Sequence, residues 1–130
     1  MKEKNITVLM VEPGKNPVVT TLENELEKLQ EAVSIGAPFT GLIEIFGIDD
    51  GVSILCNEEG KLIGLEGNRH FLGEILCGVF YVVGDDEEGN LTSLSPEILE
   101  KYSKLFWEPE EISIEDVQSS VFVKFYPWED

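Results

Sequence analysis

The sequence predicts an α+β fold: one mainly antiparallel or mixed sheet of about five to six strands, with two amphipathic helices packed on it. Short apolar runs separated by Gly, Pro and Asp turns indicate strands, and two longer segments carry apolar residues at helical spacing. With 130 residues, 42% of them hydrophobic, the chain can bury one core. We therefore expect a single domain over residues 1–130.

The first strands are predicted at the N-terminal end. Residues 6–11 are almost wholly apolar, which is typical of a central strand, and Pro13 and Gly14 end it. Residues 18–20 have strand composition. A short hairpin should join the two segments.

A helix is predicted from Leu22 onward. Its apolar residues fall at helical spacing: Leu22, Leu26, Leu29 and Val33. Thr20, followed three residues later by Glu23, matches a capping box, and residues 36–38 contain the Gly and Pro that stop a helix. A second stripe carries three carboxylates four residues apart: Glu23, Glu27 and Glu31.

The middle of the chain reads as strands and tight turns. Residues 42–48 and 52–56 flank an Asp-Gly turn, which predicts a hairpin. Residues 61–65 suggest a further short strand, the polar segment 66–70 a loop, and residues 79–83 a buried strand.

A second helix and an extension are predicted in the last third. Ser95 followed by Pro96 is a helix N-cap with proline in the first turn. The apolar face of this helix is Ile98, Leu99, Tyr102, Leu105 and Phe106. Residues 108–130 form an acidic, aromatic C-terminal extension, in which residues 121–126 predict an edge strand.

The charge balance restricts the partners of this protein. Twenty-six acidic residues against nine Lys and Arg give a net charge of −17. Such a chain repels nucleic acid and anionic membranes and attracts basic proteins. We expect a protein partner with a basic surface, no direct binding of nucleic acid, and no membrane span, since the apolar runs are too short. The N-terminus lacks the pattern of a secretory signal, which predicts a cytoplasmic location.

Some of the carboxylates are candidates for a partner-binding surface. They are Glu23, Glu27, Glu31, Glu110 and Glu111. Neighbours in the helical row would lie about 6 Å apart, close to the phosphate spacing of a DNA strand, so a DNA mimic that inhibits a nucleic-acid enzyme is an alternative. The same acidity is typical of solvated turns and helix faces. A homo-oligomer formed through the aromatic tail is a further expectation.

The residue types needed for catalysis or metal binding do not form a recognised pattern. His70 is the single histidine, and no Gly-x-Ser-x-Gly or phosphate-binding glycine motif occurs. Cys56 and Cys77 with one histidine cannot complete a structural zinc site, and the turn at residues 85–90 lacks the calcium-loop spacing. We expect no enzyme activity, no catalytic residue, no metal and no cofactor, and two reduced cysteines that pack as small hydrophobic residues.

A polar segment between residues 57 and 70 is the candidate ligand-binding or partner-binding site. Its candidate residues are Asn57, Asn68, Arg69 and His70. Amide and guanidinium groups suit a carboxylate, a phosphate or a backbone carbonyl. The structural interpretation is favoured, because Asn and Gly suit turns and Arg69 can hold a loop through carbonyl groups.

Several segments together resemble a known family. They are residues 8–15, the Leu-x-x-Leu-Gln of residues 26–30, residues 56–65 with Asn68 and Arg69, residues 78–84, and residues 92–95 leading into 100–102. In this order they resemble the family called domain of unknown function 3846, over residues 5–107. The resemblance implies a small cytosolic protein of phages and conjugative elements of Gram-positive gut bacteria, with no established activity.

The sequence favours a non-enzymatic protein-protein interaction module of a mobile element. Two alternatives stay open: a DNA-mimic inhibitor of a nucleic-acid-binding host enzyme, and a small-ligand binder or enzyme that uses the loop from Asn57 to His70.

Overall fold

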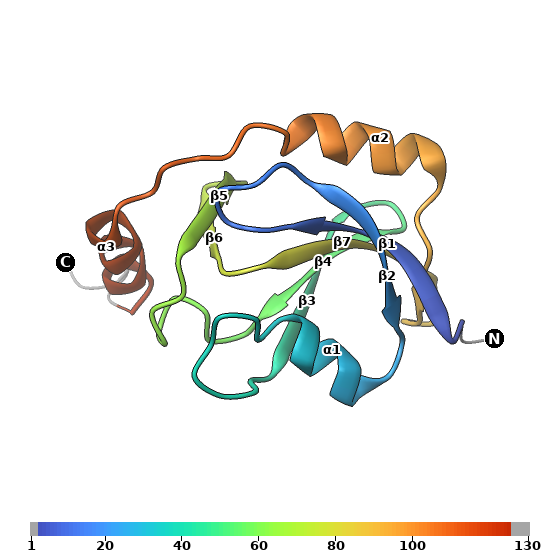
Figure 1. The fold of residues 1–130 in the computed structure, drawn as a ribbon, viewed down its shortest axis with the longest axis horizontal. Helices are drawn as coiled ribbons and strands as arrows, with labels where there is room; N and C mark the ends of the chain where they lie inside the picture. The colour runs from blue at the N-terminus through green and yellow to red at the C-terminus, as the bar shows by residue number, and fades with distance from the viewer. Residues whose placement is uncertain (1–2, 126–130) are drawn as a thin grey trace.

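The predicted α+β class is confirmed, because the described part of the chain forms a six-stranded antiparallel sheet accompanied by three helices (Figure 1). The computed structural model describes residues 3–125, with side chains for residues 3–120. In chain order the elements are β1 (Asn5–Val11), β2 (Val18–Glu23), α1 (Leu26–Ala32), β3 (Ile43–Asp49), β4 (Val52–Asn57), β5 (Gly67–Phe71), β6 (Glu74–Cys77), β7 (Phe80–Asp85), β8 (Leu91–Thr92), α2 (Pro96–Leu105) and α3 (Ile114–Phe125).

The main sheet has the strand order β2-β1-β7-β4-β3, and the short β8 pairs with β7. Its neighbouring strands are antiparallel throughout. Strands β5 and β6 form a separate hairpin. The two outer strands of the main sheet are therefore β2 and β3, and both predicted hairpins, β1–β2 and β3–β4, are confirmed.

Each face of the main sheet carries its own apolar cluster, because side chains alternate along a strand. On one face, Tyr102 and Phe106 of the α2 segment pack on Leu9, Val11, Val52, Ile54, Phe80 and Val82. On the other, Leu29 and Val33 of the α1 segment pack on Ile6, Val8, Leu55, Tyr81 and Val83. In Figure 1, α2 runs above the strands and α1 lies below them.

Helix α2 begins where the sequence predicts. The Ser95 hydroxyl accepts a hydrogen bond from the backbone N–H of Ile98 at 3.3 Å, and Pro96 occupies the first turn. Glu97 in the first turn and Lys104 in the last suit the helix dipole. Local sequence signals are sufficient to predict where this helix begins.

The predicted start of the first helix is wrong. Strand β2 continues to Glu23, which pairs with Asn5, and α1 begins only at Leu26 with no side-chain cap at Glu25. The apolar strand β1 offers β2 a full ladder of partners, and this pairing replaces the capping box expected at Thr20. Glu23 therefore lies on a strand, apart from the helical carboxylates.

The strand predicted at residues 61–65 is also wrong. Ile63 N–H donates to the Glu59 carbonyl at 3.0 Å and Leu65 N–H to the Gly60 carbonyl at 3.0 Å, which forms consecutive turns. The strand is instead β5, in the polar segment that the sequence suggested was a loop. Leu72 and Gly73 close the β5–β6 hairpin with positive φ values of 51° and 80°. Leucine is rare in that conformation, so the turn carried no sequence signal.

The edge strand predicted at residues 121–126 is wrong for residues 121–125, which belong to α3. Ser113 Oγ accepts a hydrogen bond from Asp116 N–H at 3.0 Å, a cap that the sequence analysis missed. Val117 packs the helix against the buried side chains Leu65, Ile75 and Cys77. Residue 126 and the aromatic tail after it lie outside the described residues.

Stability at high pH should depend on Tyr81. Its hydroxyl donates to the Ala32 carbonyl at 3.0 Å, and burial raises its pKa from 10.0 to about 12. The folded chain holds this proton more tightly than the unfolded chain, so its contribution is complete below pH 10 and is lost as the pH rises toward 12. Urea unfolding over this range should give a falling free energy of unfolding.

Tyr81→Phe should flatten that alkaline decline, while costing about 1 kcal/mol at neutral pH for the lost hydrogen bond. Tyrosinate absorbance should report one fewer late-titrating group. An unchanged alkaline slope in the variant would contradict the assignment to Tyr81.

Candidate functional site

Arg69 is buried, with 1% of its surface exposed, and its guanidinium donates mainly to backbone carbonyls. Nε and Nη2 donate to the Phe106 carbonyl at 3.1 and 2.9 Å, and Nη2 also reaches the Lys15 carbonyl at 2.7 Å. Nη1 donates to Asn68 Oδ1 at 2.7 Å. One side chain on β5 thus joins the end of α2 to the β1–β2 turn.

Asn68 completes this arrangement, which we call the Arg69 network. Its Nδ2 donates to the Val11 carbonyl at 2.9 Å and to the Gly78 carbonyl at 2.8 Å. Burial lowers the pKa of the Arg69 guanidinium, and the carboxylate of Glu110 opposes this effect. Because these amide and guanidinium groups already bond to the protein, Asn68 and Arg69 are not available to a ligand.

Asn57 has a similar structural role at the other end of the predicted segment. Its Nδ2 donates to the Val33 carbonyl at 3.4 Å, and its Oδ1 accepts from Glu59 N–H at 2.9 Å. A Cβ on Gly41 would lie 2.8 Å from Nδ2, so the loop after α1 needs glycine there. Asn57 therefore fixes this loop to β4.

His70 is the one predicted ligand residue of this segment that is exposed. Its Nδ1 lies 2.6 Å from Glu110 Oε1, and its backbone N–H donates to Glu110 Oε2 at 3.1 Å. These contacts hold the segment after α2 against β5. His70 and Glu110, predicted for two different surfaces, are therefore neighbours.

The predicted acidic surface does not form one row. Glu23 lies on β2, whereas Glu27 and Glu31 lie on α1, where Glu31 is 3.8 Å from Lys28 Nζ. Glu110 bonds to His70, and the adjacent Glu111 is exposed. The helical spacing that suggested a DNA mimic is therefore interrupted at the junction of β2 and α1.

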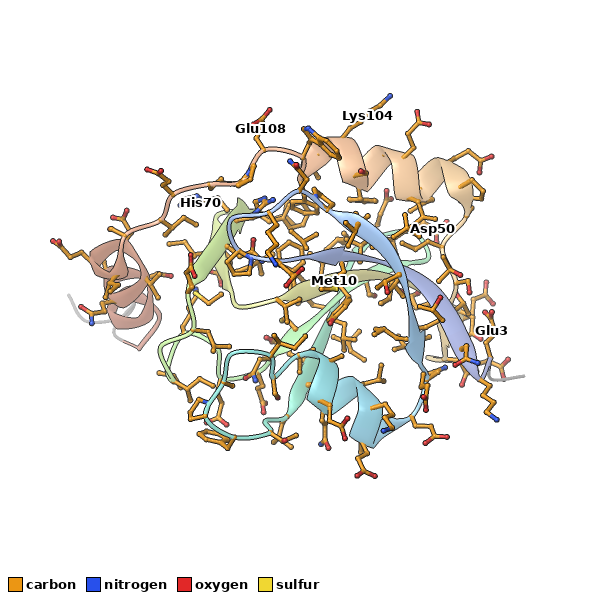
Figure 2. The ribbon with its side chains drawn as sticks, viewed as in Figure 1. Glu3, Met10, Asp50, His70, Lys104 and Glu108 are labelled. Atoms are coloured by element: carbon orange, nitrogen blue, oxygen red, sulfur yellow. The ribbon has the colours of Figure 1, made fainter. Side chains whose placement is uncertain are left out.

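Two turns distant in sequence meet in the fold and form an acidic surface that the sequence analysis did not identify. Asp85 N–H donates to the Gly51 carbonyl at 3.0 Å, which sets the β3–β4 turn beside the β7–β8 turn. We call their carboxylates the acidic end: Asp49, Asp50, Asp85, Asp86, Glu87 and Glu88. In Figure 2, Asp50 lies on the side of the molecule opposite His70.

The acidic end keeps most of its negative charge. Among the described residues, the cation that pairs with it is Lys101, whose Nζ is 3.0 Å from Asp49 Oδ2. The hydrogen bond from Lys101 holds the pKa of Asp49 below its ordinary value, and the backbone N–H of Asn90 does the same for Asp86. These two carboxylates, Asp49 and Asp86, thus lose their protons more readily than an unperturbed aspartic acid.

A cavity of about 270 Å³ lies between the β3–β4 hairpin and β6. We call it the hairpin pocket, and Phe46, Cys56 and Leu76 supply apolar surface to it. Four carboxylates also line it, those of Glu44, Glu58, Glu59 and Glu74. Glu44 Oε1 lies 3.9 Å from Cys56 Sγ, and Glu74 Oε2 lies 3.5 Å from Lys61 Nζ.

The two cysteines are buried, as predicted, and do not form a disulfide with each other. Burial raises the pKa of the Cys77 thiol, so it stays protonated at neutral pH, although nearby Lys61 opposes the shift. Within the described range, no three His, Cys, Asp or Glu side chains are grouped to hold a metal ion. Nor does any helix there have the length and apolar character needed to cross a membrane.

These features define a small acidic α+β protein with an open antiparallel sheet, in which Asn57, Asn68 and Arg69 of the candidate ligand-binding segment bond to backbone carbonyls. The chain belongs to the family described as domain of unknown function DUF3846, whose model matches residues 6–107. Helix α3 lies beyond the matched region. No curated protein and no solved structure shows significant similarity to the chain.

Replacing Arg69 should destabilise the whole fold. Arg69→Met should lower the free energy of unfolding by about 3 kcal/mol, because the buried carbonyls of Phe106 and Lys15 lose their donors. His70→Ala, at the adjacent exposed position, should cost below about 1 kcal/mol. Urea unfolding of both variants measures the difference. Equal stabilities would contradict the structural role of Arg69.

Proposed function

We propose that this protein is a non-enzymatic, cytoplasmic interaction module of a phage or conjugative element, and that its acidic end binds a basic surface of a partner protein. The observation that carries the proposal is the meeting of two acidic turns at one end of the sheet. Six carboxylates gather there beside a single paired lysine of the described chain. Such a surface attracts cationic partners over several ångströms.

The charge elsewhere on the protein supports a basic partner. All but two of the 26 acidic residues, Glu129 and Asp130, lie in the described range. Five of those carboxylates form ion pairs with lysines there, and Glu110 bonds to His70. A largely unneutralised surface favours association with a cationic protein and disfavours anionic polymers and membranes.

The two alternatives lack a comparable observation. A ligand site or an active site at residues 57–70 would need Asn57, Asn68 and Arg69, whose donors are bound to backbone carbonyls or other groups of the protein. A DNA mimic at α1 would need the row that includes Glu23, which lies on β2. Binding of a basic protein is the function that this surface supports best.

Affinity capture from cells that carry the protein tests the proposal. The variant Asp50→Asn/Glu87→Gln/Glu88→Gln removes three charges from the acidic end, and Glu23→Gln/Glu27→Gln/Glu31→Gln removes the same charge from β2 and α1. The first should reduce capture of basic proteins about tenfold, since each exposed charge contact contributes about 0.2–1 kcal/mol. The second variant should capture basic proteins within about twofold of the natural chain.

Salt and DNA separate the remaining explanations. Raising the ionic strength above about 0.15 M should weaken capture, because charge attraction is then screened beyond about 8 Å. Captured proteins that are not basic, or binding that salt does not weaken, would refute the proposal. Loss of capture in the second variant, together with displacement by duplex DNA, would favour the DNA mimic instead.

A further inference from the structure

Strand β3 has an unpaired side. It is the last strand of the main sheet, and Glu58 N–H donates to the Leu42 carbonyl at 3.0 Å, which marks residues 42 and 58 as a hydrogen-bonded pair. In an antiparallel ladder, hydrogen-bonded residue pairs alternate with pairs that are not hydrogen-bonded, so every second residue bonds to the neighbouring strand. The backbone N–H and C=O groups of Glu44 and Phe46 therefore point toward β4. The backbone N–H and C=O groups of the residues between and beside them point outward: Ile43, Ile45 and Gly47.

This side lacks most of the features by which proteins protect an edge strand. Residues 43–47 contain no lysine and no proline, and the bulge in the ladder comes only between Gly47 and Asp49. Ile45 is 43% exposed and Leu42 is 55% exposed. No hydrogen bond to the outward groups of Ile43, Ile45 or Gly47 comes from the part of the chain that the structure describes. An extended segment therefore has access to them.

The hairpin pocket lies next to this strand, on the face to which Glu44 and Phe46 contribute. Lys61 is already held by Glu74 at 3.5 Å and by Ser120 Oγ at 2.8 Å. Glu44 is the carboxylate of β3 in the pocket, and it faces no cation of the described chain within salt-bridge distance. A side chain with an apolar stem and a positive end suits Phe46 and Glu44 together.

We propose that β3 accepts an extended, lysine-bearing segment of a partner protein as an added strand, with one lysine side chain entering the hairpin pocket beside Glu44. Main-chain hydrogen bonds would supply affinity and the pocket would supply specificity. This inference rests on the proposed function, since it identifies how the basic partner binds. Strand β3 ends at Asp49, so a segment that continues along it reaches the acidic end.

Charge favours such a partner over a second copy of this chain. Pairing two β3 strands would bring together two Glu44-bearing edges of molecules that each carry a net charge of −17. Like charges on opposed edges are unfavourable. A cationic strand instead gains attraction along the same edge.

The test uses the full chain and an N-acetylated, C-amidated peptide in which Val and Lys alternate. Alternation sets all lysines on one face of a strand, beside Glu44, and all valines on the other, beside Ile45. The amide signals of Ile43, Ile45 and Gly47 should shift on titration in nuclear magnetic resonance spectra. A peptide with norleucine in place of lysine should bind more weakly.

Three variants locate the peptide. Ile45→Pro removes an outward N–H without removing a β3–β4 hydrogen bond, and should weaken binding by at least about tenfold. Ile45→Thr keeps the backbone N–H, and its affinity for the peptide should stay within about twofold of that of the natural chain. Glu44→Gln should weaken binding about fivefold and reduce its dependence on salt. If Ile45→Pro does not fold, a peptide N-methylated at alternate residues tests the same hydrogen bonds on the natural chain.

Strand addition at β3 would be overturned if the natural chain bound the N-methylated peptide at full strength. It would also be overturned if a folded Ile45→Pro variant bound the unmethylated peptide at full strength. The proposed function would still stand if the acidic-end variant lost capture of basic proteins. Conversely, capture unaffected by that variant and by salt would refute the proposed function even where the peptide binds β3. A dimer in sedimentation experiments that Ile45→Pro abolishes would assign the edge to a second copy and overturn this inference.

Discussion

The buried guanidinium of Arg69 is the interaction on which the arrangement of this protein depends. Desolvating a charged side chain is costly unless its donors are satisfied, and here carbonyls from three parts of the chain satisfy them. These hydrogen bonds fix the β5–β6 hairpin against the end of α2, where Phe71 and Phe106 pack with ring centroids 5.3 Å apart. That position of the hairpin in turn forms one wall of the hairpin pocket.

The same constraint separates the interior from the surfaces left for binding. The polar groups best suited to recognition are used within the Arg69 network, whereas the carboxylates remain outside. Two surfaces then stand out: the acidic end, and the unpaired side of β3 with Glu44 beside the hairpin pocket. Strand β3 ends at the acidic end, so the basic partner that we propose would contact both surfaces, and this continuity links the two proposals.

The sequence predicts more of the fold than of the candidate site. Ser95 and Pro96 are sufficient for α2, and the Asp-Gly turn before Val52 is sufficient for the β3–β4 hairpin, because both signals act within a few residues. The junction of β2 and α1 was misplaced, since pairing with β1 outweighs a local capping pattern. The structural interpretation of Asn57 and Arg69 was favoured from composition, but their partners are 24 and 37 residues away in Val33 and Phe106.

By itself the sequence determined the α+β class, α2, two hairpins and the net charge, because these follow from composition and from patterns a few residues long. Only the tertiary structure decided that the β3–β4 and β7–β8 turns share one acidic end, that Glu23 leaves the helical row, and that β3 is an outer strand. These depend on strand order and register, which arise from contacts between distant segments and leave no local pattern.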